Sequence, residues 1–373
     1  MSAADTTDRS ALLLSGSLGM GHDVMAQACE VSLSRRGWQT ELLDSLRLMG
    51  ATAGDLGEKV FRGLMRTPGL YDAFHFEQLR PGGRLARYAE RSSSRYLVPA
   101  LREQLDDRPA ALLISVFATG AAAASRVKAE HPGLVTWVFC TDVCPHRLWV
   151  HADTDLFLVT SEAARRYVRR YEPRAEVEVV PAPVRPQFYN APDRTAARAS
   201  LGVDPAAACV LLMSGSWGIG PLVQAAEAIA DAGVQVLAVA GRNEQLAGDL
   251  RVASRRRRRI VPFGFTDQVP TLMSAADLVI TSSGDTCSEA RVLGRDLLLL
   301  DVIAGHGREN LQHELERGHA DIAPNEPGAL ADAALACLDR IAAAGPPEDL
   351  RAITGQRWEA AIDSALARFG LLR

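Results

Sequence analysis

The chain has 373 residues, of which 47% are hydrophobic and 23% charged, as in ordinary soluble globular proteins of about two domains. The formal net charge of -4 argues against a nucleic-acid-binding protein, and the six cysteines are scattered along the chain. Residues 1–10 are too polar for a signal peptide, and no apolar run reaches the ~18–20 residues of a membrane helix, so we expect a cytoplasmic protein with free thiols.

The first half of the chain alternates apolar runs, which predict buried parallel strands, with helical stretches. A strand at 11–15 leads into a turn rich in glycine, and a helix from about 23 to 35 follows, ending before Gly37. Further strands of this half are expected at 40–44, 111–116, 134–139, 156–160 and 177–180.

The second half repeats this plan, with a strand at 209–213, a glycine-rich turn at 214–220 and a helix at 222–231. Alternating strands and helices predict parallel sheets that bind ligands at the carboxyl ends of their strands. Further strands of this half are expected at 234–240, 260–264, 278–281 and 297–301.

Three prolines at positions 181, 183 and 186 interrupt the pattern, because proline continues neither a helix nor a central strand. We therefore predict an N-terminal domain at 1–183, a C-terminal domain at 184–355 and a terminal helix at 356–373, whose apolar residues fall on one side.

The most informative segment is 282–290, Ser-Ser-Gly-Asp-Thr-Cys-Ser-Glu-Ala, which follows the apolar run at 278–281. It predicts a strand, a turn of small residues and a helix start, whose unpaired N–H groups and dipole suit an anion. Glu289 falls inside this helix, where its carboxylate is able to accept two hydroxyls, as a ribose offers. The combination predicts a nucleotide-sugar site.

Two Rossmann-like halves with glycine-rich first turns resemble the GT-B glycosyltransferases. Segments 282–290 and 305–310 are similar to the donor signature of the branch that contains monogalactosyldiacylglycerol synthase, bacterial diacylglycerol glucosyltransferases and the peptidoglycan N-acetylglucosaminyltransferase. The resemblance covers nearly the whole chain, and the motifs that narrow it to the diacylglycerol side are Gly19-Met20-Gly21-His22, 141–149 and 183–188. It implies an α/β GT-B fold, in which two Rossmann-like domains face a cleft and the C-terminal helix crosses back to the N-terminal domain.

This resemblance implies an inverting, metal-independent hexosyltransferase that moves a sugar from a UDP-sugar to a hydroxyl of a diacylglycerol-like lipid or a natural product. No cofactor is expected beyond this nucleotide-sugar co-substrate, and no nucleic acid. The segment 56–80 is apolar and carries arginines, and the run Arg255 to Arg259 is basic. Both leave open a peripheral contact with the inner face of the membrane, although the first also fits a pocket for a soluble acceptor and the second a solvated loop.

By the same resemblance, His22 and Asp142 handle the proton of the acceptor hydroxyl, either of them as base or Asp142 as the group that orients His22. Trp149 either packs on the acceptor or belongs to the core. The residues expected to contact the acceptor are Gly21, His146 and Trp149. The residues expected to hold the donor are Gly215, Ser216, Trp217, Phe263, Gly264, Phe265, Ser283, Gly284, Thr286, Glu289, His306 and Asn310.

The chain departs from the family at Gly305-His306-Gly307, where Gly-Gln-Glu is usual and the Gln and Glu face the donor sugar. This difference leaves the sugar open and motivates an alternative hypothesis, a degenerate nucleotide-binding protein without turnover. A UDP-sugar 2-epimerase-like isomerase shares the architecture and is another alternative, although segment 141–149 is typical of the transferases.

Overall fold

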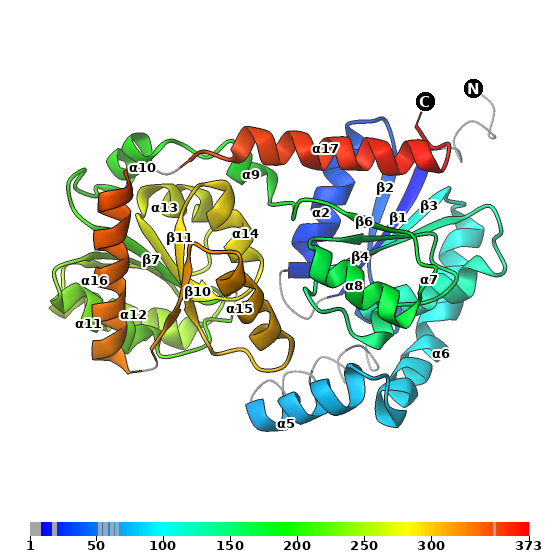
Figure 1. The fold of residues 1–373 in the computed structure, drawn as a ribbon, viewed down its shortest axis with the longest axis horizontal. Coiled ribbons are helices and arrows are strands. Elements are labelled where there is room, and N and C mark those ends of the chain that lie inside the picture. Colours follow the sequence, from blue (N-terminus) through cyan, green and yellow to red (C-terminus); the bar gives the residue numbers. More distant parts are fainter. Residues whose placement is uncertain are drawn as a thin grey trace. The chain divides into compact units, whose positions relative to one another are not determined.

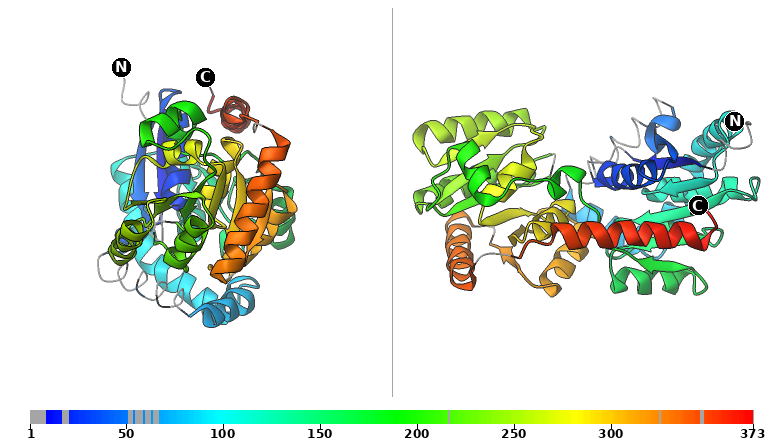
Figure 2. Two further views of the ribbon diagram at one scale, coloured as in Figure 1. Left: turned by 90° about the vertical axis from the view of Figure 1, so that its left-hand side faces the viewer. Right: turned by 90° about the horizontal axis from the view of Figure 1, so that it is seen from above.

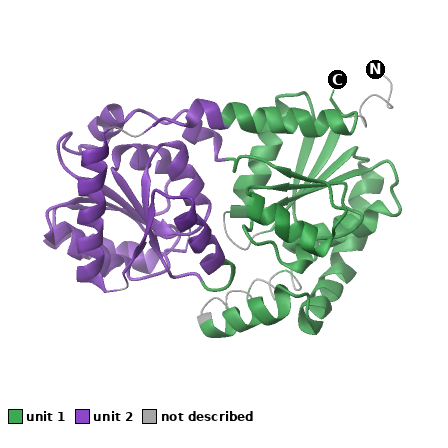
Figure 3. Cartoon of the chain, in the orientation of Figure 1, with its two compact units in different colours: residues 1–183, 304–306, 355–373 green, residues 184–303, 307–354 purple. Residues whose placement is uncertain are grey.

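The computed structural model describes residues 9–16, 21–50, 54, 59, 63, 67–215, 217–324, 326–345 and 348–372. The chain divides into two compact units (Figure 3). Unit 1 comprises residues 1–183, 304–306 and 355–373, and unit 2 comprises residues 184–303 and 307–354. The unit boundary after Pro183 falls in the proline-rich segment.

Unit 1 contains a six-stranded parallel sheet in the order β2-β1-β3-β4-β5-β6 (Figure 1). Its strands are β1 (Ser10–Ser15), β2 (Gln39–Asp44), β3 (Leu112–Ser115), β4 (Val135–Cys140), β5 (Leu156–Val159) and β6 (Val177–Val179). Its helices are α2 (Gly21–Ser34), α3 (Ser45–Leu48), α5 (Pro68–Phe74), the π-helix η1 (His75–Leu79), α6 (Arg84–Asp107), α7 (Ala118–Lys128), the 3₁₀ turn η2 (Arg147–Trp149), α8 (Glu162–Tyr171) and most of α17 (Arg351–Arg368).

Unit 2 contains a second six-stranded parallel sheet, in the order β12-β11-β10-β7-β8-β9. Its strands are β7 (Cys209–Met213), β8 (Gln235–Val239), β9 (Ile260–Phe263), β10 (Leu278–Ser282), β11 (Asp296–Leu300) and β12 (Ala320–Ala323). Its helices are α9 (Pro186–Tyr189), α10 (Arg194–Leu201), α11 (Leu222–Asp231), α12 (Glu244–Arg256), α13 (Val269–Ala275), α14 (Asp285–Val292), α15 (His306–Glu316) and α16 (Pro327–Ala344).

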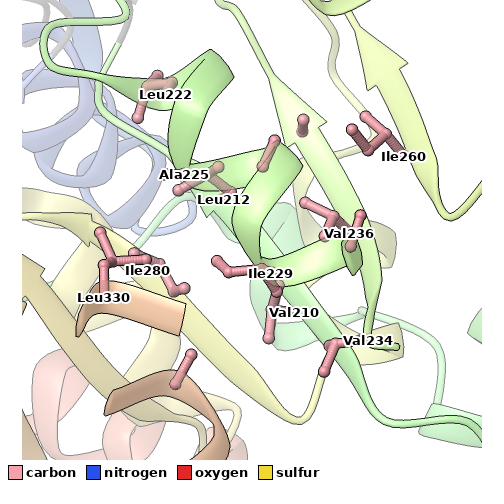
Figure 4. Close-up of a cluster of buried hydrophobic side chains, with 14 of the residues drawn as sticks. Val210, Leu212, Leu222, Ala225, Ile229, Val234, Val236, Ile260, Ile280 and Leu330 are labelled. Carbon is pink, nitrogen blue, oxygen red and sulfur yellow. The ribbon is translucent and has the colours of Figure 1, made fainter. Parts of the chain in front are cut away.

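The central strands of both sheets are buried on both faces, as the continuous apolar runs predict. In β7, Val210 and Leu212 pack under α11, α12 and α16 (Figure 4), whereas Leu211 packs on the opposite face with α13 and α14. In β1, Leu13 faces α2 and Leu12 faces α6 in the same alternating way. The buried strands place their carboxyl ends, and the turns that follow them, along one edge of each sheet.

The C-terminal helix α17, red in Figure 2, packs into unit 1. The indole of Trp358 stacks on Phe139 of β4 with ring centroids 5.8 Å apart, and its Nε1 donates to Ser32 Oγ at 2.7 Å. Arg36 pairs with Glu359 and Asp363. The chain therefore returns to its N-terminal unit, as the resemblance implies. Among the described residues, no helix has the length and apolar character needed to cross a membrane.

Candidate active site

His22 lies at the start of α2, directly after the glycine-rich turn that follows β1. Its Nδ1 atom lies 2.7 Å from the carbonyl oxygen of Val116, and its ring packs edge-on against Phe117 with centroids 5.0 Å apart. A carbonyl oxygen only accepts, so this contact requires Nδ1–H and leaves Nε2 with the lone pair in the neutral ring. His22 is thereby arranged to accept a proton at Nε2. Residues Gly19 and Met20 of the preceding motif lie outside the described residues.

Asp142 follows β4 and accepts a hydrogen bond of 2.9 Å from Nε1 of Trp149. Burial raises the pKa of this carboxyl, but His306, His146, the Trp149 hydrogen bond and His22 together outweigh burial and leave the pKa below its usual value. Asp142 is therefore an anion that several histidines surround, and its hydrogen bond goes to Trp149 while that of His22 goes to Val116. Among the described residues, the hydrogen-bond partner found for the His22 ring is therefore a main-chain carbonyl, whereas Asp142 acts on His22 through its charge.

Trp149 is 2% exposed and packs among Val138, Phe157 and other core residues of unit 1. This burial favours the core interpretation of Trp149 over an exposed platform for a sugar. Its ring centroid nevertheless lies 6.3 Å from the ring centroid of His22 and 6.3 Å from that of His146, so the indole is a neighbour of both imidazoles.

Four histidines of unit 1 gather around Asp142: His22, His75, His146 and His306. Burial lowers the pKa of His146 to about 4, although Asp142 acts in the opposite direction. Burial also lowers the pKa values of His75 and His306. These three imidazoles are therefore neutral near neutral pH, and they are able to act as donors and acceptors without adding positive charge.

The sequence patterns did not identify Tyr71 or His75, which belong to α5 and η1. Tyr71 Oη lies 2.9 Å from His306 Nδ1, and the His75 ring centroid lies 6.2 Å from that of His146. Asp72 accepts a hydrogen bond of 2.6 Å from the backbone N–H of Gly305. The π-helix that carries His75 is a geometry often found at functional sites, but it has no sequence signature.

In unit 2, the turn after β7 has the backbone that a phosphate cradle requires. Gly215, Gly218 and Gly220 all have positive φ, and a Cβ at Gly218 would lie 2.6 Å from Leu246 Cδ2 and 2.9 Å from the Ala240 carbonyl oxygen. The carbonyl of Trp217 accepts from Asn243 Nδ2 at 3.4 Å. Ser216 lies outside the described residues.

Ser214 opens this turn with a buried hydroxyl. Within the described part of the chain, no hydrogen-bond partner is found for its Oγ atom. A buried hydroxyl without a partner is costly and rare, so the atom is suited to meet a ligand.

The second segment that is expected to bind the donor begins where β10 ends. Ser283 Oγ donates to the carbonyl oxygen of Gly307 at 2.6 Å, which fixes the turn against the start of α15. Gly284 is the N-cap of α14, and Thr286 lies in the first turn of that helix. The helix start therefore presents N–H groups beyond the end of the central strand of the sheet, as predicted.

Glu289 of α14 is 3% exposed, and both of its carboxylate oxygens face Arg185. Arg185 Nε donates to Oε1 at 2.7 Å and Nη2 donates to Oε2 at 3.2 Å. Burial raises the pKa of Glu289 to about 7, against the opposing effect of Arg185. The segment 183–188 indicated a domain boundary and a motif, but nothing in the pattern indicated that its arginine would pair with Glu289.

The remaining donor-site candidates differ in their exposure. Phe263 is half-buried and its carbonyl accepts from the Ala240 N–H at 2.9 Å, whereas Phe265 is exposed beneath the guanidinium of Arg242 at 5.0 Å. Gly264 lies between them, and apart from its chain neighbours nothing lies within 4 Å of the position that a Cβ would take. Asn310 is half-buried in α15, and Nε of the exposed Arg308 on the same helix lies 3.9 Å from Asp301 Oδ1.

Comparison with known proteins gives relatives in sequence and in fold. No protein-family model matches the chain. Monogalactosyldiacylglycerol synthase from spinach is 32% identical over 185 residues, which are 46% of this chain and 35% of that protein. A probable monogalactosyldiacylglycerol synthase 2 from rice is 31% identical over 202 residues, 50% of this chain and 43% of that protein.

A processive diacylglycerol beta-glucosyltransferase from Bacillus pumilus is 28% identical over 180 residues, 47% of each chain. The aligned region thus spans less than half the length of each of these three relatives.

Solved structures match over nearly the whole chain. Sucrose-phosphate synthase from Thermosynechococcus elongatus has a TM-score of 0.60 at 15% identity and covers 96% of this chain and 98% of its own. UGT2 from Phytolacca americana, in complex with UDP-2-fluoroglucose and pterostilbene, has a TM-score of 0.59 at 14% identity, with coverages of 97% and 99%. HepE from Anabaena in complex with UDP has a TM-score of 0.55 at 19% identity, with coverages of 96% and 98%.

These likenesses confirm the fold and the resemblance that the motifs indicated, and both the relatives and the structural neighbours are glycosyltransferases. The chain therefore has the GT-B fold, and over about half of its length its sequence is similar to monogalactosyldiacylglycerol synthases and a diacylglycerol glucosyltransferase.

Proposed function

We propose that the protein is a glycosyltransferase that moves a sugar from a UDP-sugar to a hydroxyl of a diacylglycerol-like lipid. The single observation that carries this proposal is Glu289, a buried carboxylate one helical turn beyond the glycine-capped start of α14. An anion-binding helix start next to a carboxylate that suits a vicinal diol fits a nucleoside diphosphate. The lipid acceptor is supported by the sequence relatives, which are a monogalactosyldiacylglycerol synthase and a diacylglycerol glucosyltransferase.

The proposed reaction inverts the sugar. The acceptor oxygen attacks the anomeric carbon as the bond from that carbon to the UDP oxygen breaks, and Nε2 of His22 takes the hydroxyl proton. The Nδ1 contact with the Val116 carbonyl supports this role, because it holds Nε2 in the form that accepts a proton. UDP departs with the bonding electron pair.

We propose that turnover does not require a divalent ion. The growing charge on the departing diphosphate is stabilised instead by the N–H groups of the 214–220 turn and by the start of α14. The Ser214 hydroxyl adds a neutral donor at the beginning of that turn.

We further propose that unit 1 reaches its lipid acceptor by contacting an anionic membrane surface through α6. Leu85, Tyr88 and Tyr96 are among the most exposed large apolar side chains of the structure. Exposed arginines alternate with them along the helix, at positions 84, 87, 91 and 95. Aromatic and leucine side chains with surrounding arginines suit the lipid interface, where each basic residue contributes about 1 kcal/mol.

The membrane proposal is tested by sedimentation with vesicles of phosphatidylcholine alone or with phosphatidylglycerol. We expect binding to the anionic vesicles and its loss in the Leu85→Ser, Tyr88→Ser double variant. A matched control is Val252→Ser on α12, which is also exposed. Equal binding of the variant and the wild type would refute a role for α6.

The transferase proposal is tested in two steps, both with EDTA present. A thermal-shift panel of UDP, GDP, TDP and their sugar conjugates first identifies the donor, and we expect stabilisation by the UDP compounds. Transfer from the preferred conjugate to diacylglycerol in detergent is then measured.

A product with the opposite anomeric configuration supports the inverting reaction. Binding of UDP without transfer to any acceptor would instead favour a degenerate nucleotide-binding protein. The sequence feature that suggests this alternative is His306-Gly307, which stands where Gln-Glu is usual in the family. Restoration of activity by a divalent ion would refute metal independence.

A further inference from the structure

The ion pair between Arg185 and Glu289 joins two segments of unit 2 that are far apart in sequence. Glu289 lies on α14 with its side chain 4% exposed, and Arg185 precedes α9 with its side chain 23% exposed. Two hydrogen bonds of 2.7 and 3.2 Å connect the guanidinium to the two carboxylate oxygens. This parallel arrangement fixes the plane of the carboxylate as well as neutralising it.

Arg185 is itself held in place from both sides. Val184 and Phe188 are 1% and 0% exposed and both belong to the apolar core beneath α13 and α14. The residue stands before Pro186, which restricts its backbone, and its guanidinium lies 5.0 Å from the Phe188 ring centroid. The arginine is therefore presented to Glu289 in a prepared position.

The pair leaves part of the carboxylate available. A carboxylate has about four lone-pair directions, and the two Arg185 hydrogen bonds use two of them. The remaining two are sufficient for the two adjacent hydroxyls of a ribose.

Charged neighbours of Glu289 are few. Arg185 lowers the pKa of Glu289, whereas burial and Asp285 on the same helix raise it, with a resulting value of about 7. Of the elements packed against α14, β10 has no ionisable side chain and α9 carries Tyr189. Strand β11 carries Asp296, which lies 3.3 Å from His319, and α15 carries Glu314, which pairs with Arg291 of α14. Within the described part of the chain, Arg185 is the cation found to oppose protonation of Glu289.

We infer that Arg185 is a positioning residue for the nucleotide: it favours the ionised form of Glu289 and turns the carboxylate so that its remaining lone pairs accept the vicinal hydroxyls of the nucleoside. This inference rests on the proposed function and deepens it, because it assigns to the segment before α9 a part in donor binding. The ligand feature that it concerns is the diol, not the phosphates or the sugar.

The test is calorimetric titration with UDP and with 2′-deoxy-UDP between about pH 6 and about pH 9. The proteins are the wild type, Arg185→Met, Arg185→Lys, Glu289→Gln and the control Arg255→Met, an exposed arginine at the end of α12. Circular dichroism and melting temperatures establish that each variant is folded.

We expect Arg185→Met to bind UDP about tenfold more weakly than the wild type near pH 6, but within about threefold of the wild type near pH 9. The reason is that the pKa of Glu289 rises when Arg185 is removed, and the ionised fraction of a carboxyl falls tenfold per pH unit below its pKa. Arg185→Lys keeps the charge but not the fork, so its loss is expected to be the same at every pH. Neither change is expected to matter much for 2′-deoxy-UDP, which lacks the diol, and Arg255→Met should match the wild type.

An equal loss of UDP affinity at every pH in Arg185→Met, or a loss of the same size for 2′-deoxy-UDP, would overturn the positioning role while leaving the proposed function standing. Unchanged UDP affinity in a folded Arg185→Met protein would overturn it as well. Failure of the wild type to bind UDP at all would overturn the proposed function and this inference with it.

Discussion

The Nδ1 atom of His22 lies 2.7 Å from the carbonyl oxygen of Val116, which belongs to the connection between β3 and α7. The protonated nitrogen of the ring is thus set by the main chain of a neighbouring strand end. Asp142, the other candidate for this orienting role, accepts a hydrogen bond from Nε1 of Trp149. The arrangement predicts that the two residues contribute to catalysis by different amounts.

Replacing His22 by alanine is expected to lower kcat by about 10²–10⁴, because general-base catalysis contributes on this scale. The dissociation constant of UDP should stay close to that of the wild type, since no donor-binding role is assigned to His22. Initial rates and calorimetry measure the two quantities, and His131→Ala provides a control in a turn of the same unit. A wild-type kcat in His22→Ala would refute the assignment.

Asp142→Asn is expected to retain at least about tenfold more activity than His22→Ala. The pKa of Asp142 lies below its usual value, which makes it a weak base, and asparagine keeps an oxygen that accepts from Trp149. Removing the charge should also lower the pKa values of His75 and His306 further, because Asp142 raises both. Rates and NMR titration of the histidine ring carbons test these statements. Should Asp142→Asn be the less active variant, Asp142 would become the preferred base.

The stability of the wild type relative to Glu289→Gln is expected to fall as the pH rises. The pKa of Glu289 is raised from 4.5 to about 7, so between these values the folded protein binds a proton that the unfolded chain has lost. That contribution is complete below about pH 4.5 and is lost as the pH passes about 7. Denaturant unfolding of both proteins at several pH values measures the difference, and a constant or increasing difference would contradict a raised pKa.

The apolar runs allowed most of the strands to be predicted: the runs 209–213 and 278–281 correspond to β7 and to all but the last residue of β10. Strand β12 was missed, because Ala320–Ala323 is short and contains Asp321, and it forms only beside β11. The position of Glu289 inside a helix that follows a turn of small residues was predictable from its motif. The partner of Glu289 is 104 residues away, and the partner of His22 is a main-chain oxygen, which no residue pattern marks.

Gly120→Ala is expected to destabilise unit 1 by about 1–3 kcal/mol, the usual range for overpacking in a core. A Cβ at this position in α7 would lie 2.5 Å from Ser115 Oγ, 3.1 Å from Ser45 Oγ and 3.2 Å from Leu14 Cβ. Gly133→Ala is the control, since nothing lies within 4 Å of its Cβ position. Denaturant unfolding curves compare the two variants, and equal midpoints would show that α7 moves to relieve the clash.

Trp358→Ala is expected to cost about 3–5 kcal/mol, as for other large aromatic side chains removed from cores. The side chain is 3% exposed, stacks on Phe139 and donates to Ser32. Its exposed neighbour Arg357 provides a matched control as Arg357→Ala. A melting temperature unchanged by Trp358→Ala would mean that α17 adds little to unit 1.

Because Trp358, Ile362 and Leu366 belong to the same core as Leu13 and Met25, β1 and α2 pack against residues that are synthesised after the whole of unit 2. The ribosome must deliver the whole of unit 2 before the core of unit 1 is complete. During that interval the apolar surface beside α2 is uncovered in the nascent chain, which makes it a place where a chaperone would engage. A fragment that stops after Pro183 lacks the α17 residues of this core, so it would carry the same uncovered surface permanently.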